Sequence, residues 1–152
     1  MPLSSNTTLT LPIPNAHFIW YCAWLSIPSA IYAYAHPATV HFAMVPASVF
    51  ATSLLYWRDP IRDSWRRKLD MVVVSAGLIH HMYYAFRTIR HASHTHFGVY
   101  IALIGTSVAC YGVSHYLLTR GRIWPATYAH ASIHLVANIA NIVLYYRSIS
   151  HK

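Results

Sequence analysis

Acidic side chains are scarce in this chain: Asp59, Asp63 and Asp70 are its three acidic residues among 152. Charged residues make up 9% of the sequence, whereas about 25% is usual for soluble domains. Hydrophobic residues make up 56%. A surface with so few charges is not wetted on all sides, so the composition favours a membrane protein with a single domain.

The sequence also lacks several motifs that would assign a function directly. It has no glycine-rich phosphate-binding loop and no paired-cysteine zinc motif. Its two cysteines, Cys22 and Cys110, lie in apolar runs and are expected to be small core residues rather than a disulfide framework. The formal net charge of +8 gathers at the ends of apolar segments, not in one patch, which argues against a nucleic-acid partner.

Residues 1–16 are expected to form an extended lead-in. The stretch MPLSSNTTLTLPIPN contains no Lys or Arg, which argues against a secretory signal and an arginine-rich transit peptide. Pro12 and Pro14 disfavour regular structure there. A helical transmembrane domain over 17–147 and a tail over 148–152 complete the expected organisation.

Five apolar segments approach the roughly 20 residues that a helix needs to cross hydrocarbon. They are 17–35, 40–57, 69–86, 97–118 and 126–146. The expected fold class is therefore all-α, a multi-pass transmembrane helix bundle of about five spans. Pro28 and Pro46 fall inside the first two segments, where neighbouring helices can satisfy the freed carbonyls.

Basic residues divide unevenly between the two ends of these predicted spans. Seven lie in the loops after the second and fourth spans, namely Arg58, Arg62, Arg66, Arg67, Lys68, Arg120 and Arg122. Four lie at the other end, namely Arg87, Arg90, Arg147 and Lys152. The positive-inside rule therefore predicts that the larger group and the N-terminus are on the cytosolic side.

Asp70 differs from the other two acidic residues in its position. Asp59 and Asp63 lie among arginines in a loop, where local ion pairs explain them most simply. Asp70 follows the basic run WRRKL at the start of the third predicted span. One interpretation is a carboxylate near a helix start, stabilised by the helix dipole and nearby arginines. The other is an intramembrane carboxylate that orients a water or a histidine, since ionisable groups at such depth are rare without a role.

The last predicted span carries a line of polar side chains. At about 100° per residue, these side chains fall within an arc of roughly 80° on one helix face. They are His130, His134, Asn138 and Asn141. The spacing His-x-x-x-His suits two zinc ligands one turn apart, while hydrogen-bonded packing histidines are the alternative. The asparagines are better explained as hydrogen-bonding groups between helices, so we expect the line to face protein rather than lipid.

The paired histidines are predicted to lie at the same membrane depth as several other polar residues. The end of the second span, the start of the third, the end of the fourth and the start of the fifth all lie in the cytosolic half. The candidate constellation consists of Ser53, Asp70, His115, His130 and His134. If this half of the bundle holds a metal, His115 is the third histidine available to it.

Two stretches resemble the CREST superfamily, which includes alkaline ceramidases, progestin and adiponectin-type receptors, and the phospholipases that remodel GPI anchors. The stretch SLLYWRDPIRDSWRRKLDM, from Ser53 to beyond Asp70, is similar to the family's Ser-to-Asp portion, and AHASIH is similar to its paired histidines. The resemblance implies that His130 and His134 are zinc ligands. It also implies catalytic roles for Asp70, which would hold or activate the metal-bound water, and for Ser53, which would support the site.

The sequence departs from that family in two places. Trp57 stands where the family pattern has a histidine, and an indole cannot bind zinc. His115, or less favourably His81, would have to provide the third imidazole. The family also usually has seven spans, whereas this sequence predicts five.

Three functions stay open at this stage. The preferred one is a non-catalytic subunit or scaffold of a membrane assembly, with the polar line joining helices. The alternative is a zinc-dependent lipid amidase or esterase, in which the metal would lower the pKa of its bound water to about 7. The third is a b-type haem protein with His81 and His134 as axial ligands. The expected partners are the lipid bilayer and other membrane subunits.

Overall fold

The computed structural model describes residues 8–150, and this part of the chain is almost entirely helical. An isolated antiparallel bridge between Leu9 and Ile61 is the one extended pairing in it. The helical segments are α1 Ile13–Cys22, η1 Ala23–Leu25, α2 Ser26–Tyr34, η2 Val40–Phe42, α3 Met44–Trp57, α4 Trp65–Tyr84, the π-helical η3 Ala85–Ile89, α5 Arg90–Ala92, α6 His94–Thr119 and α7 Ile123–Ile149. The all-α prediction is therefore confirmed.

Pro28 and Pro46 lie near the starts of α2 and α3. Pro28 and Pro46 are each the third residue of their helix, α2 and α3 respectively. The N–H groups of a first turn have no acceptor within the helix, so proline removes no helical hydrogen bond there. The short 3-10 segments η1 and η2 precede these two helices. The predicted spans 17–35 and 40–57 are therefore helical along most of their length, with a 3-10 segment inside the first and at the start of the second.

The ends of the described chain differ slightly from the predicted lead-in and tail. Helix α1 begins at Ile13, inside the predicted lead-in 1–16, because Pro14 lies in its first turn and is compatible with helix there. Helix α7 ends at Ile149, inside the predicted tail 148–152. Residues 1–7 and 151–152 lie outside the described residues.

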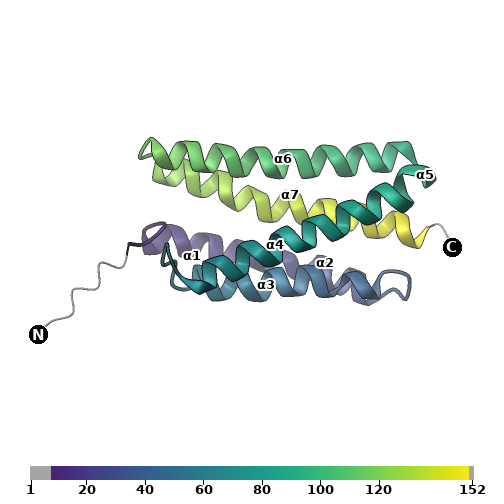
Figure 1. Cartoon of the computed structure of the whole chain (residues 1–152), viewed down its shortest axis with the longest axis horizontal. Coiled ribbons are helices and arrows are strands. Elements are labelled where there is room, and N and C mark those ends of the chain that lie inside the picture. Colours follow the sequence, from purple (N-terminus) through teal and green to yellow (C-terminus); the bar gives the residue numbers. More distant parts are fainter. Residues whose placement is uncertain (1–7, 151–152) are drawn as a thin grey trace, which may run out of the picture.

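The helices run antiparallel along one long axis (Figure 1). The α3–α4 loop and the α6–α7 turn lie at one end of the bundle, while α5 and the end of α7 lie at the other. We call the first the basic end, because its connections 58–64 and 120–122 are rich in arginine, and the second the far end. The two basic connections thus share one end, as their predicted grouping requires.

Two helical stretches of the described chain are long and apolar enough to cross a membrane. They are Val40–Trp57 and His94–Thr119. Helix α4 begins with a basic run, and α7 carries the line of His and Asn side chains, so both are more polar than these two stretches. The structure therefore supports a helical protein with two candidate spans, and the five-span topology stays a prediction.

Helix α4 departs from the direction of the other helices. It packs along α3 and crosses the bundle diagonally to the far end, where η3 contacts α6 (Figure 1). Helices α6 and α7 form the most extensive helix pair. The α3–α4 pair and the α6–α7 pair therefore meet at the far end and separate toward the basic end.

Two apolar clusters close the ends of the bundle. The cluster at the basic end is made of Leu11, Ala16, Ile19, Tyr56 and Trp57. The larger cluster is made of Ala33, Phe42, Ala85, Ile89, Tyr100, Ala140, Leu144 and Tyr145. In this larger cluster the rings of Phe42 and Tyr145 stack with their centroids 5.5 Å apart. The space between the two clusters is where the polar side chains of α7 lie.

Residues 8–11, which we call the N-terminal strap, lie across the α3–α4 loop. The N–H of Thr10 donates to the Pro60 carbonyl at 2.8 Å, and the N–H of Arg62 donates to the Thr8 carbonyl at 3.0 Å. The Tyr56 hydroxyl donates to Thr10 Oγ1 at 2.6 Å. Leu11 is buried in the basic-end cluster. Backbone and side-chain bonds together therefore fix the strap against the start of the helical hairpin.

Gly77 allows α4 to approach α3 closely, which gives a first testable prediction. A Cβ added at this position would lie 2.7 Å from a methyl carbon of Val45. We expect Gly77→Leu to lower the free energy of unfolding by about 1–3 kcal/mol through overpacking. Gly105→Leu is the matched control, because nothing lies within 4 Å of a Cβ added there. Equilibrium unfolding in mild detergent measures both, and equal stability of the two variants would contradict the close approach.

Candidate functional site

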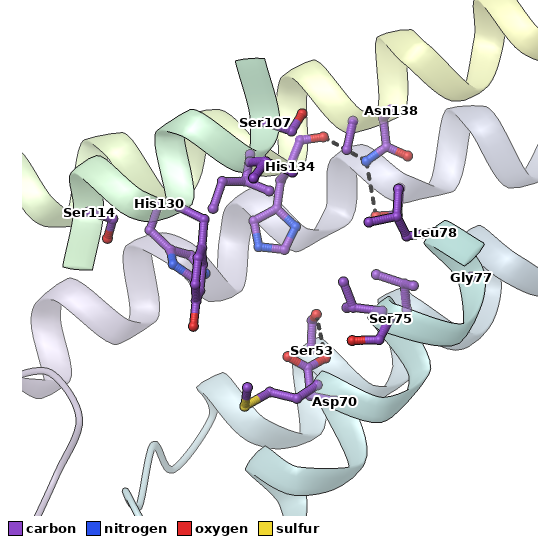
Figure 2. Close-up of a pocket in the computed structure, with 18 of the residues that line it drawn as sticks. Ser53, Asp70, Ser75, Gly77, Leu78, Ser107, Ser114, His130, His134 and Asn138 are labelled. Carbon is purple, nitrogen blue, oxygen red and sulfur yellow. Dashed lines mark hydrogen bonds between the residues drawn. The ribbon is translucent and has the colours of Figure 1, made fainter. Parts of the chain in front are cut away.

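A cavity of about 450 Å³ lies between the α3–α4 pair and the α6–α7 pair (Figure 2). Most of its wall is apolar, with valine, leucine, isoleucine and methionine side chains from α3, α4 and α6. All five members of the predicted constellation line it: Ser53, Asp70, His115, His130 and His134. The structure therefore brings the sequence-predicted residues into one cavity, while their chemical roles stay predictions.

Asp70 and its partners form one wall of the cavity. The Ser53 hydroxyl donates to Asp70 Oδ1 at 2.8 Å, and the Thr52 hydroxyl donates to the same oxygen at 2.9 Å. Both hydroxyl residues are buried on α3. The second oxygen, Oδ2, has no hydrogen bond or ion pair within residues 8–150. Thr52 is a partner that the sequence pattern did not identify.

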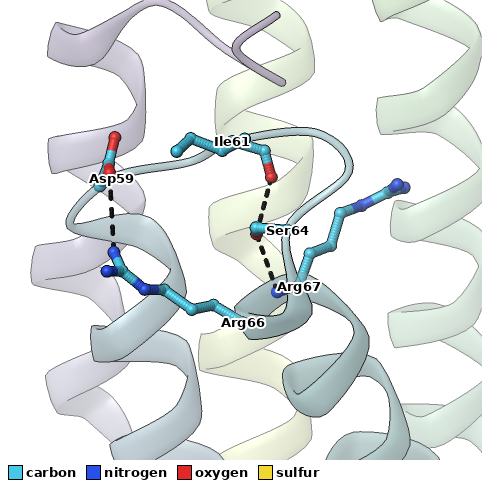
Figure 3. A network of polar contacts seen from close by, with 5 residues as sticks. All are labelled: Asp59, Ile61, Ser64, Arg66 and Arg67. Carbon is cyan, nitrogen blue, oxygen red and sulfur yellow. Dashed lines mark hydrogen bonds and ion pairs between the residues drawn. The ribbon is translucent and has the colours of Figure 1, made fainter. Parts of the chain in front are cut away.

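Ser64, and not Asp70, caps the N-terminus of α4. Ser64 fills that role, because its hydroxyl oxygen accepts from the Arg67 N–H at 3.3 Å and its hydroxyl donates to the Ile61 carbonyl at 2.8 Å (Figure 3). Asp70 is the sixth residue of the helix, beyond the first turn in which the dipole acts strongly. Its partners are hydroxyls of α3 rather than arginines, so the predicted stabilisation by nearby arginines is not seen.

The charged residues of the α3–α4 loop interact with each other at the surface. Arg66 Nη1 lies 3.6 Å from Asp59 Oδ2, the one ion pair among residues 8–150 (Figure 3). Both side chains are partly exposed, so the pair contributes little to stability. Arg67 Nη1 donates to the Arg62 carbonyl at 3.2 Å. The ion pair predicted for Asp59 is present, whereas the one predicted for Asp63 is not formed within residues 8–150. The Arg67 guanidinium donates within the loop although its residue also lines the cavity.

The paired histidines of α7 project from the opposite wall toward Ser53 and Asp70 (Figure 2). The ring centroids of His130 and His134 are 6.0 Å apart. Trp57 packs edge to face with the His130 ring at 4.9 Å. Neither imidazole has a hydrogen-bond partner within the described chain. The cavity therefore has unpartnered nitrogen atoms on one side and an unpartnered carboxylate oxygen on the other.

Asn138 has a different role from the two histidines. Its Nδ2 donates to Ser26 Oγ at 3.2 Å and to the His134 carbonyl at 2.7 Å, and the Ser29 hydroxyl donates to its Oδ1. Ser26 and Ser29 belong to α2. Asn138 therefore joins α7 to α2, which is the interhelical role that the line of polar residues predicts.

The histidines present do not fit a zinc ion with three protein ligands. Across residues 8–150, no group of three or more His, Cys, Asp or Glu side chains is arranged to hold a metal. His115 is exposed on α6 and does not join the pair on α7. His81, the other candidate third ligand and a proposed haem ligand, has its Nε2 3.2 Å from the Tyr145 hydroxyl. The two imidazoles of α7 are thus without the third ligand that a catalytic zinc site requires.

Tyr100 is a cavity residue that the sequence did not indicate. It is fully buried, lines the cavity, and its hydroxyl has no hydrogen-bond partner within the described residues. In the apolar run GVYIALIG a tyrosine is typical of a lipid-facing anchor, so no sequence signal distinguishes it. The cavity therefore contains polar groups at both ends.

Comparison of the chain with protein families, curated proteins and solved structures gives no match.

Proposed function

We propose that this protein is a multi-pass membrane protein, a non-catalytic component of a membrane assembly that holds an amphipathic molecule in its cavity. The observation that carries the proposal is the mostly apolar cavity with unpartnered polar atoms on facing walls. Ligand pockets characteristically combine apolar walls with a few convergent polar groups. An amphipathic ligand would satisfy both kinds of surface.

The exposed surface of the helices supports the bilayer as its surroundings. Ile31, Val72 and Ile79 expose 62%, 64% and 69% of their surface. These large apolar side chains belong to α2 and α4, two of the helices that are too short or too polar to be identified as spans by composition alone. Apolar exposure at that level on several helices favours contact with lipid over contact with water. It supports the proposed five-span topology.

The cavity reaches the outer surface between α4 and α6. Met71 and Val74 on α4, and Val108 and Tyr111 on α6, line the cavity and are also exposed. These two helices separate toward the basic end, because α4 packs along α3 and η3 provides the contact with α6. A molecule dissolved in the bilayer could therefore enter sideways with its tail among apolar side chains.

The residue set favours binding over hydrolysis. A zinc-dependent amidase would need a third protein ligand beside His130 and His134. Trp57 occupies the space beside His130, and its indole provides no ligand. Ser53 and Asp70 form a hydrogen-bonded pair, but neither contacts an imidazole that could act as its base partner in the described chain. Polar contacts with the head group of a bound molecule account for the same residues without a reaction.

Filling the cavity tests this proposal. We expect Ala137→Phe, which adds a ring to the α7 wall of the cavity, to reduce the amount of lipid that co-purifies with the protein by about tenfold or more. Ala109→Phe is the matched control on α6, because Ala109 is exposed and does not line the cavity. Mass spectrometry of the organic extract measures bound lipid per chain, and the thermal midpoint verifies folding. Equal lipid in both folded variants would contradict the proposal.

A further inference from the structure

We propose that the ligand of the cavity is an amphipathic amine, whose cationic head pairs with Asp70. The inference rests on the proposed function and specifies the chemistry of the bound molecule. It starts from the charge balance of the cavity wall. Asp70 is the one acidic residue that lines the cavity, and within residues 8–150 no Lys, Arg or His nitrogen lies within 4.0 Å of its carboxylate.

The hydrogen bonds of Asp70 orient the carboxylate and leave one side of it open. Ser53 and Thr52 both donate to Oδ1, and both are fixed on α3. Hydroxyl donors support the charged form of a carboxylate, but they supply no positive charge. Oδ2 has no protein partner in the described chain. A cationic donor at Oδ2 would complete the coordination of this carboxylate, and charge-assisted hydrogen bonds are stronger than neutral ones.

The facing wall suits an ammonium group in particular. An ammonium carries three N–H donors, and a neutral imidazole offers one acceptor nitrogen. His130 and His134 point into the cavity without hydrogen-bond partners within the described residues. Together with Asp70 they provide three acceptors from two walls. Tyr56 and Trp57 line the same end, and aromatic rings attract cations.

The competing charge near the cavity is Arg67, which would favour an anionic head group instead. Its Nη1 donates to the Arg62 carbonyl at 3.2 Å, so the guanidinium is engaged in the loop. No Lys and no second Arg lines the cavity, whose other nitrogen-bearing basic side chains are histidines. The apolar lining from Val49, Val74 and Ile104 requires the remainder of the ligand to be apolar. These features distinguish an alkylamine from a free cation and from a fatty acid.

Three probes with the same tail test the inference: octylamine, octan-1-ol and octanoate. Each is titrated into the purified full chain in a non-ionic detergent, and binding is followed by the increase in thermal midpoint. We expect octylamine to bind about tenfold or more tightly than octanol, because it adds a charge-assisted hydrogen bond. We expect octanoate to bind more weakly than octanol, because its carboxylate meets that of Asp70.

Asp70→Asn tests the residue, and Asp59→Asn is the matched control because Asp59 lies at the surface in the loop. The preference for octylamine should disappear in Asp70→Asn and persist in Asp59→Asn. If Asp70→Asn does not fold, the comparison of probes on the unaltered chain still decides the question. A preference for octanol or octanoate, or an unchanged amine preference in Asp70→Asn, overturns the amine proposal alone. If none of the three binds to the folded protein, the proposed binding function fails as well.

Discussion

Replacing Trp57 with histidine is expected to give the protein a zinc site. The Trp57 ring lies 4.9 Å from that of His130, which in turn lies 6.0 Å from that of His134. An imidazole introduced at this position would join the pair and supply a third ligand, which is the number typical of catalytic zinc sites. We expect about one zinc per chain in Trp57→His and far less in the unaltered protein. Elemental analysis after purification in zinc-containing buffer and a brief chelator wash measures the difference.

The zinc experiment has two controls within the same chain. Trp124→His introduces an imidazole at an exposed tryptophan that does not line the cavity, and should retain no zinc after the wash. Adding His130→Ala and His134→Ala to Trp57→His should abolish zinc binding. One zinc per chain in the unaltered protein, lost in His130→Ala/His134→Ala, would contradict the non-catalytic proposal and favour the zinc-dependent hydrolase.

Asn138→Leu is expected to weaken the packing of α7 against α2. The substitution removes the bonds of Asn138 to Ser26 and Ser29, which connect α7 to α2. Hydrogen bonds between helices in membrane proteins contribute about 0.6–1.7 kcal/mol each. The loss of both should therefore lower the free energy of unfolding by about 1–3 kcal/mol, as measured by unfolding in mixed detergent micelles.

A double-mutant cycle separates this bond from simple changes in packing. Ser26→Ala removes one of the two acceptors of Asn138 Nδ2, so part of the cost of the two substitutions is shared. The combined variant should lose less stability than the sum of the single variants. Strict additivity would mean that the observed bond contributes nothing to folding. Asn138→Leu should leave the exposed loop pair Arg66–Asp59 unaffected.

Much of the helical architecture could be predicted from the sequence, because apolar segments and their polar ends are local properties. The segment 97–118 corresponds to α6, and 126–146 lies within α7. Pro28 and Pro46 lie inside helical stretches, as predicted, but the 3-10 segments η1 and η2 before them were not predicted, because proline is equally compatible with a kinked helix and with a first helical turn. The π-helical η3 and the diagonal course of α4 depend on packing between distant segments, and no local pattern encodes them.

The sequence predicted which residues line the candidate site, but it did not predict the contacts that these residues make there. Periodicity placed His130 and His134 on one face, and depth placed Ser53 and Asp70 at the same level, so their meeting in one cavity followed from the topology. The contact of Trp57 with His130 was not predictable, because it depends on how α3 packs against α7. Thr52 is adjacent to Ser53, and which of two neighbouring hydroxyls reaches a carboxylate is decided by helix rotation.

The N-terminal strap has a consequence for how the cavity would exchange its contents. Thr10 and Leu11 line the cavity at the basic end, and the bonds to Tyr56 and Pro60 hold them there. In the proposed bilayer placement the strap covers part of the basic end of the cavity, while exposed side chains line the side between α4 and α6. Occupancy would then follow the mole fraction of the ligand in the surrounding leaflet and not its aqueous concentration. A compound that partitions poorly into lipid would then not reach the cavity in this protein, however well its head group fits.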